Sequence, residues 1–243
     1  MSIRKLNRFL FPCALVGIIG FSNPAMAAGS DPLESLNRKI FAFNETIDRW
    51  LMRPVADAYV ELAPSPIQRG IGNVLWNLAD ATSVLNSVLQ GRMDDASLGL
   101  ARFVVNTTAG VGGLFDVGTE IGLDRRYADF GQSLARWGAS SGPYLVLPVL
   151  GRSSVRDGIG VAVDALGLSV PAHLSSTQAR SMIGGTALVH TRSQYVDVDD
   201  LITGDRYVFY REAYLQRRTE LTGDPSNGWD FSYFESDPLD DDL

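Results

Sequence analysis

The chain has 243 residues, of which 45% are hydrophobic, and a formal net charge of −7, since 28 acidic residues outnumber 21 Lys and Arg. A chain with this charge carries no basic footprint of the kind that binds nucleic acid, so we expect no nucleic acid partner. One cysteine and two histidines supply neither a disulfide framework nor the ligand spacing of a zinc site, so we predict no metal site.

The first 27 residues have the pattern of an export signal. A basic start is followed by an apolar run from Phe9 to Phe21 and by an A-x-A cleavage site at Ala25–Ala27. The run has about 13 residues, whereas a helix that spans a bilayer needs at least roughly 17. We therefore predict a cleaved signal peptide over residues 1–27, with a membrane anchor as the alternative. Cys13 follows a proline inside the run, so we do not interpret it as a lipid attachment site.

The other end of the chain is acidic. Residues 224–243 contain seven Asp or Glu and no basic residue, a composition typical of a disordered tail. The body between these ends, residues 28–223, has a net charge of −3 and about 195 residues. That length is sufficient for one domain with a core of its own.

Helices are predicted through this body, beginning near residue 31. Asp31 is a suitable cap, Pro32 fits the first helical position, and Glu34 would complete a capping box. Apolar residues then recur at steps of three and four, the spacing of one helix face: Leu33, Leu36, Ile40, Phe43, Ile47 and Trp50. We expect Arg53-Pro54 to interrupt this helix and a second helix to continue to Pro64.

The remaining helices are marked by their ends. Apolar residues between Ile67 and Leu89 indicate further helix, which Gly91 would end as a C-cap. The next helix is expected from Asp94 or Asp95 to about Asn106. Later candidates for helix ends are Ser153, Ser154, Ser176, Asp205 and Gly223. No series of strands and turns appears, so we predict an all-α fold with Gly- and Pro-rich connecting loops.

The first predicted helix carries a strip of polar residues. At about 100° per residue, Asn37, Asn44 and Asp48 fall within roughly 40° of one another, and apolar residues such as Ile40 and Phe41 flank them. The simpler interpretation is the boundary between core and solvent. The alternative is a narrow polar track in an apolar surface, which would suit a lipid because its head group needs hydrogen bonds and its tails need apolar contact.

A glycine-rich stretch, NTTAGVGGLFDVG, spans residues 106–118. It has neither G-K-[ST] nor G-x-G-x-x-G spacing, so we predict neither a P-loop nor a dinucleotide site. Glycine is costly inside packed regular elements. Close backbone packing or a hinge is therefore the better interpretation of Gly110, Gly112 and Gly113.

The sequence GASSG at residues 138–142 fits the G-x-S-x-G nucleophile elbow of hydrolases and would make Ser140 the nucleophile. Acidic and histidine residues follow in the order of a Ser–Asp–His triad: Asp157, Asp164, His173 and His190. The elbow needs a strand, a sharp turn and a helix. Here a helical pattern precedes the motif, and the segment after it cannot be a helix. A periplasmic lipid hydrolase that uses Ser140 is therefore kept only as an alternative function.

The segment GPYLVLPVLG at residues 142–151 is apolar and uncharged. It is too short to span a bilayer, and Pro148 excludes a regular helix through its middle. It also lacks the apolar–polar alternation of a half-buried strand. We therefore expect neither a helix nor a sheet here.

In this order, the segments resemble the MlaA family, also called VacJ. The resemblance extends from residue 31 to about residue 222 and rests on DPLESLNRKIFAFN, RPVADAY, NVLWNLADATSVLNSVLQG, RFVVNTTAGVGGLFDVG, DFGQSLARWGASSGPYLVLPVLG and REAYLQRR. It implies an all-α, ring-shaped domain of amphipathic helices over residues 28–223 with a central channel, located in the inner leaflet of the outer membrane. It also implies association with a trimeric porin, passage of phospholipids to a periplasmic carrier, and neither enzymatic activity nor a cofactor.

The resemblance also indicates where a channel and its gate would lie. We expect the FAFN stretch and the polar strip to influence whether the channel is open. We expect the apolar segment to be covered by protein or to line a passage reached by water, because irregular backbone is not tolerated bare in lipid. The candidate residues are Asn37, Phe41, Phe43, Asn44, Asp48, Gly142, Pro143, Tyr144, Leu145, Leu147 and Pro148. The chain departs from many members by lacking a credible lipid attachment site and by its residues at Ala81-Thr82 and Gly151-Arg152.

Overall fold

The computed structural model describes residues 31–195 and 202–223. The signal peptide expected over residues 1–27 and the acidic tail expected from residue 224 lie outside the described residues. The described chain is mostly helical, as predicted, and contains one short hairpin. Its helices are α1 (Glu34–Ile47), α2 (Arg53–Leu62), α3 (Ser65–Leu89), α4 (Met93–Thr108), α5 (Val117–Glu120), α6 (Phe130–Arg136), α7 (Val155–Val163), α8 (Thr177–Ser193) and α9 (Arg206–Thr222), and its strands are β1 (Tyr144–Leu147) and β2 (Gly151–Ser154).

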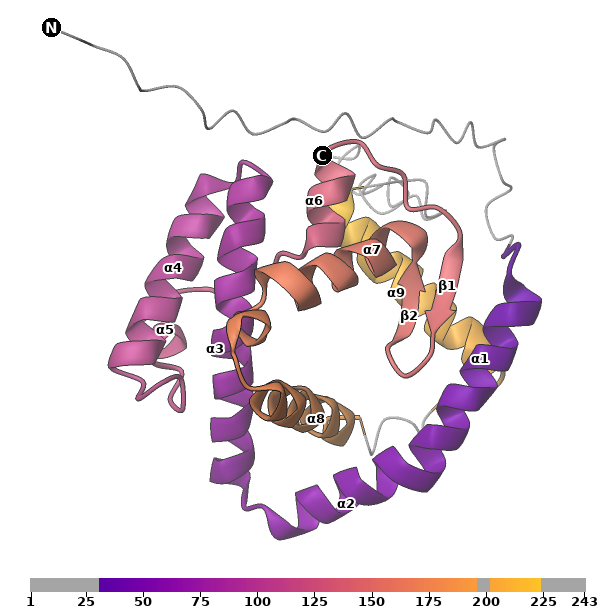
Figure 1. Ribbon diagram of the computed structural model, residues 1–243, viewed down its shortest axis with the longest axis horizontal. Coiled ribbons are helices and arrows are strands. Elements are labelled where there is room, and N and C mark those ends of the chain that lie inside the picture. Colours follow the sequence, from indigo (N-terminus) through magenta and orange to yellow (C-terminus); the bar gives the residue numbers. More distant parts are fainter. Residues whose placement is uncertain (1–30, 196–201, 224–243) are drawn as a thin grey trace, which may run out of the picture. The chain divides into compact units, whose positions relative to one another are not determined.

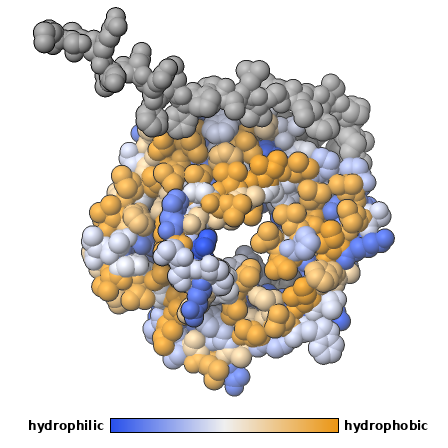
Figure 2. Space-filling view, in the orientation of Figure 1, coloured by the Kyte–Doolittle hydropathy of each residue, from blue (hydrophilic) through white to orange (hydrophobic). Residues whose placement is uncertain are grey.

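The elements from residue 31 onward are arranged around an opening (Figure 1). In this view α3, α7, α8 and the β1–β2 hairpin border the opening, while α1 and α2 follow the outer rim. Figure 2 shows that the opening persists between the side chains. The predicted ring of helices is therefore confirmed.

Helices α1 and α2 are continuous, so the predicted interruption at Arg53-Pro54 is wrong. A π-helical turn, Asp48–Met52, joins them, and Arg53 donates its N–H to the carbonyl of Asp48. Pro54 occupies the first turn of α2, where the altered hydrogen bonding of the π-turn lets the helix tolerate its missing N–H. The joint bends the helical path around the opening (Figure 1).

The start of α1 also differs from the prediction. The Asp31 carboxylate accepts a hydrogen bond from the N–H of Leu33 at 3.0 Å, and the helix begins at Glu34. Glu34 pairs with Arg38 at 2.7 Å, so no capping box forms. Other predicted helix ends are confirmed: the side chains of Ser154, Ser176 and Asp205 cap α7, α8 and α9, and Gly91 and Gly223 adopt positive φ after α3 and α9.

Polar side chains fill much of the interior. The fully buried side chains include Arg102, Asn37, Asn86 and Asn106, whereas the predicted apolar faces lie largely outside. Trp50, for example, is 78% exposed. Figure 2 shows hydrophobic residues over much of the visible surface of the ring. The core expected of residues 28–223 is therefore mostly polar within residues 31–195 and 202–223, where a small apolar cluster forms around Tyr144, Val146 and Tyr207.

Arg102 of α4 anchors the loop between α4 and α6. Its fully buried guanidinium lies 2.8 Å from Asp116 and 3.6 Å from Asp80, and it donates to the carbonyl of Leu123. Arg125 pairs with the same two carboxylates at 3.3 and 3.1 Å. Several partners are needed here because a buried charge without them is very costly.

Two further observations concern only residues 31–195 and 202–223. No helix there combines the length and the apolar character that crossing a bilayer requires. Nor do three His, Cys, Asp or Glu side chains come together where they could share a metal ion.

Helices α6 and α7 pack most closely where Gly131 meets Gly160. A Cβ at Gly160 would lie 2.8 Å from Gly131 Cα and 3.2 Å from the carbonyl carbon of Phe130, so the backbones would have to separate. We expect Gly160→Ala to lower the free energy of unfolding by about 1–3 kcal/mol. Gly184→Ala is the control, because nothing lies within 4 Å of its Cβ position and alanine favours a helix. Equal losses of unfolding free energy for Gly160→Ala and Gly184→Ala in chemical denaturation would show that the approach of the two backbones does not require glycine at residue 160.

Candidate functional site

The apolar segment 142–151 forms a β-hairpin at the border of the opening, so the prediction of neither helix nor sheet is wrong. Strands β1 and β2 are antiparallel, with Val146 opposite Arg152. The turn covers residues 148–150, where Val149 has a φ of 66°. The two prolines flank β1 instead of interrupting it.

Helices cover both faces of β1, which explains why the segment does not alternate. Tyr144 and Val146 are buried in a cluster with α9, where the ring centroids of Tyr144 and Tyr214 lie 5.6 Å apart. Leu147 lies on the other side of the strand, close to Gly158 of α7. A strand covered on both faces has a continuous apolar sequence.

Asn37 of α1 pairs with the outer edge of β1. Its Nδ2 donates to the carbonyl of Tyr144, and its Oδ1 accepts from the N–H of Val146, both at 2.9 Å. The carboxamide thus supplies the donor and the acceptor that a neighbouring strand would supply. Asn37 is fully buried, and its Nδ2 also lies 3.2 Å from the Asp31 carboxylate.

Asn44 repeats this arrangement two helical turns later. It donates to the carbonyl of Leu147 at 2.9 Å and accepts from the N–H of Val149 at 2.8 Å. A spacing of seven residues places both amides on one side of α1. We call Asn37 and Asn44 the asparagine clamp, because together they attach the hairpin to α1.

Asp48, the third residue of the polar strip, binds a different element. Its carboxylate accepts from the guanidinium of Arg192 in α8 at 2.6 and 3.0 Å. All three side chains of the strip therefore bind other parts of the protein. In this conformation they connect the rim to the hairpin and to α8, and they are not free to bind a lipid head group.

The remaining candidates of the hairpin region have different surroundings. The ring of Phe41 lies 5.7 Å from that of Tyr207 in α9, whereas Phe43 is 52% exposed. Gly142 has a φ of 68° before β1. On the hairpin, Leu145 and Leu147 are partly buried and Pro143 and Pro148 are exposed.

The three candidate glycines belong to another part of the fold, the turn after α4. A Cβ at Gly113, whose φ is 92°, would lie 2.7 Å from the Cβ of Asn77 in α3. Gly110 lies against the backbone of Asn106, and Gly112 has open space around it and a φ of 70°. This turn packs on α3 and does not join the hairpin site.

Ion pairs connect α1 to the start of α9. Arg38 lies 2.8 Å from Asp205, and Glu45 lies 2.9 Å from Arg206. Sequence reasoning gave Asp205 a capping role and missed its ion pair, since the partners are 167 residues apart.

Residues 29–221 match the family model described as MlaA lipoprotein. The chain belongs to the MlaA family. Proteins of Shigella flexneri and Escherichia coli strain K12 are 35% and 34% identical to it over 196 residues, which are 77% of this chain and 76% of each relative. Both are named intermembrane phospholipid transport system lipoprotein MlaA.

Other relatives of this MlaA-family chain match over a shorter length. An uncharacterized protein of Rickettsia prowazekii is 40% identical over 127 residues, 52% of this chain and 51% of that protein. The chain thus spans about half the length of these rickettsial relatives. A solved structure on the structural basis for maintenance of bacterial outer membrane lipid asymmetry is 34% identical, has a TM-score of 0.71, and matches over 79% of this chain and 99% of its own.

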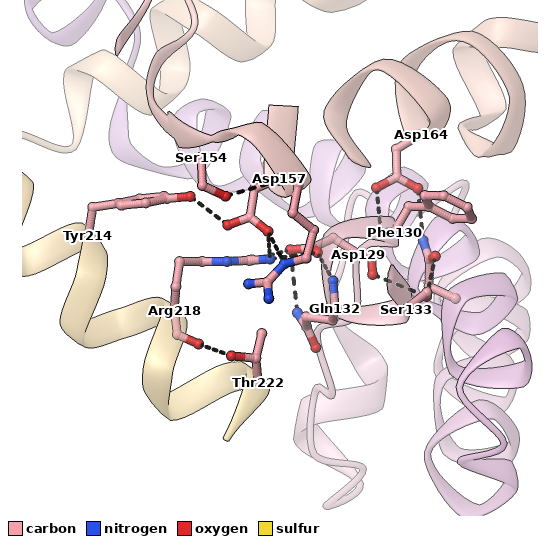
Figure 3. Close-up of polar contacts among 12 residues, drawn as sticks. Asp129, Phe130, Gln132, Ser133, Ser154, Asp157, Asp164, Tyr214, Arg218 and Thr222 are labelled. Atoms are coloured by element: carbon pink, nitrogen blue, oxygen red, sulfur yellow. Dashed lines mark hydrogen bonds and ion pairs between the residues drawn. The ribbon is translucent and has the colours of Figure 1, made fainter. Parts of the chain in front are cut away.

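In this MlaA-family chain, a buried ionic cluster joins α6, α7 and α9 (Figure 3). Arg218 lies 2.6 Å from Asp129 and 2.7 Å from Asp157, and the Tyr214 hydroxyl donates to Asp157 at 2.5 Å. Burial raises the pKa of Asp157, but the charges of Arg218 and Arg156 and the hydrogen bonds from Arg218 and Tyr214 together outweigh burial and hold that pKa below its usual value. Sequence reasoning missed this cluster, because no local pattern connects residues 89 positions apart.

The G-x-S-x-G motif has a different context in this MlaA-family chain from that of a nucleophile elbow. Ser140 is exposed in the connection between α6 and β1, so a helix precedes it and a strand follows, the reverse of the elbow order. His190 Nδ1 lies 3.1 Å from the Tyr59 hydroxyl, and His173 Nδ1 lies 3.1 Å from the carbonyl of Ser169. These contacts do not assemble a triad at Ser140.

Proposed function

We propose that this chain is an outer-membrane phospholipid channel. It takes mislocalised phospholipids from the outer leaflet and passes them to a soluble periplasmic carrier, which maintains the asymmetry of the membrane. It resides at the periplasmic face of the outer membrane, in the inner leaflet, and contacts a trimeric porin. Two relatives named for intermembrane phospholipid transport support this assignment.

The observation that carries the proposal is the opening through the ring, together with the distribution of polarity around it. Exposed apolar side chains such as Trp50, Leu62 and Phe115 are costly in water and favourable against acyl chains, at about 25 cal/mol per Å². Patches of this kind mark contact with a membrane or a protein. A ring with this exterior can sit in a leaflet without any helix that spans it.

The hairpin is the part of the border best suited to act as a gate in this proposal. Its outer edge is attached to α1 by the four hydrogen bonds of the asparagine clamp. Side-chain hydrogen bonds of this kind contribute about 1 kcal/mol each, so they can be exchanged without unfolding the ring. The clamp would thereby set the fraction of time in which the passage is open.

The test measures surface-exposed phospholipid in a deletion strain, with and without the full-length chain supplied back. We expect deletion to raise outer-leaflet phospholipid and the wild-type chain to restore asymmetry. Ser140→Ala is expected to restore it equally, because a channel makes no covalent bond to its cargo. Restoration by wild type but not by Ser140→Ala would indicate a lipid hydrolase instead. An unchanged outer leaflet after deletion would refute the proposed function.

A further inference from the structure

A cationic and aromatic cluster lies beside the hairpin. Arg152 of β2 is exposed, and its guanidinium stacks 4.4 Å from the ring centroid of Tyr210 in α9. Arg206 approaches the same ring at 5.8 Å and pairs with Glu45 of α1 at 2.9 Å. For Arg152, no acidic partner lies within ion-pair distance in the part of the chain that the structure describes.

Apolar aromatic surface adjoins these cations. The ring centroid of Phe209 lies 5.6 Å from that of Tyr210, and Phe209 is 49% exposed. Phe41 approaches Tyr210 from α1 at 6.2 Å. The exposed guanidinium of Arg152, the partly buried guanidinium of Arg206 and the half-exposed ring of Phe209 are thus brought together by β2 and α9, with α1 beside them.

The strand register directs a backbone donor of β2 away from β1. Asn37 binds the carbonyl of Tyr144 and the N–H of Val146, so these groups point away from β2. Val146 and Arg152 therefore form a non-hydrogen-bonded pair, and the N–H of Arg152 points away from β1. Figure 1 shows β2 as the strand nearer to the opening.

We propose that Arg152, Arg206, Phe209 and Tyr210 form a binding site for the phosphate of a lipid head group at the border of the opening. A guanidinium presents paired N–H donors that match two phosphate oxygens, and the Tyr210 ring orients that of Arg152. Phe209 supplies apolar contact for the beginning of an acyl chain. This inference rests on the proposed function and names the chemistry by which the channel recognises its cargo.

The test uses the full-length chain in detergent with three probes: short-chain phosphatidylglycerol, the corresponding diacylglycerol, and inorganic phosphate. We expect Arg152→Ala to weaken phosphatidylglycerol binding about 10-fold, as the loss of a charge-assisted contact would, and to leave diacylglycerol binding unchanged. Arg152→Lys keeps the charge but not the paired donors, so it should lie between. Arg136→Ala, which removes another exposed arginine, is the control and should bind like wild type.

The possible outcomes distinguish a failure of the proposed site from a failure of the proposed function. Equal phosphatidylglycerol binding by wild type and Arg152→Ala would overturn the site, while the proposed function would stand if the wild-type chain restores asymmetry in the deletion strain. Inorganic phosphate bound as tightly as phosphatidylglycerol, with both weakened by Arg152→Ala, would make this an anion site without lipid specificity and would also overturn it. A wild-type chain that binds neither lipid probe would count against the proposed function itself.

Discussion

Replacing Arg218 with alanine is expected to lower the free energy of unfolding by about 3–5 kcal/mol, because the change leaves a buried and a partly buried carboxylate without their shared cation. Arg218 of α9 pairs with Asp129 before α6 and with Asp157 of α7, so all three elements lose a common attachment (Figure 3). The adjacent Arg217→Ala is the matched control. Its exposed pair with Glu220 contributes little, about 0.5 kcal/mol or less. Urea denaturation followed by circular dichroism measures both variants.

An acid titration tests the same cluster independently. In the folded chain the pKa of Asp157 lies below its usual value of 3.8, so its ionised form stabilises the fold above that pH, and this stabilisation is lost as the pH falls through the folded pKa. The difference in stability between wild type and Asp157→Asn should therefore be largest near neutral pH and shrink in acid. A difference that does not vary with pH, or an Arg218→Ala variant as stable as Arg217→Ala, would show that the cluster does not hold these helices together.

Asn37→Ala is expected to cost about 2–4 kcal/mol in unfolding free energy and to release the hairpin from α1. The change leaves the carbonyl of Tyr144 and the N–H of Val146 without their partner, and each unsatisfied buried group costs about 1–3 kcal/mol. On the proposed function, a released hairpin changes the state of the gate. Surface phospholipid and outer-membrane permeability should therefore differ from wild type in complemented cells.

A second clamp variant distinguishes an effect on the proposed gate from a loss of unfolding free energy. Asn44→Ala removes the equivalent pair of bonds at a partly exposed position, so it should cost less stability and still alter the phenotype. Asn73→Ala, which removes a solvent-exposed bond to the carbonyl of Leu114 from a partly exposed position, is the control on α3. If hydrogen exchange of Val146 and Val149 and the lipid phenotype are unchanged in both clamp variants, the clamp does not govern the hairpin.

The helices could be predicted because their signals are local. Spacing of apolar residues and the caps at Ser176, Asp205 and Gly223 depend only on neighbours in sequence, and they placed most helix ends correctly. Which side of a helix is buried is a different question. Periodicity identifies an apolar face, but Trp50 lies on such a face and is exposed, whereas Asn37 is buried. The sequence cannot distinguish an apolar core from an apolar exterior by spacing alone.

The hairpin and the hydrogen-bond partners of its clamp could not be predicted from the sequence. The polar spacing of Asn37 and Asn44 was recognised, but their partners are backbone groups more than 100 residues away, and backbone groups leave no trace in the sequence. β1 was missed for a related reason, since a strand covered by α7 and α9 has no polar face to reveal its period. Arg152 was noticed only as a departure from the family, because its stacking on Tyr210 depends on how two distant elements meet.

The ion pairs between α1 and α9 also have a consequence for biogenesis. A polypeptide is made from its N-terminus, and α9 is the last helix of the described chain, so its contacts with α1 can form only after the other described elements have been made. The ion pairs Arg38–Asp205 and Glu45–Arg206 are therefore among the last contacts of the described chain to form. A chain cut short before Asp205 would lack these ion pairs and the helix that covers Tyr144 and Val146, and its hairpin would be held to α1 by the asparagine clamp without that cover.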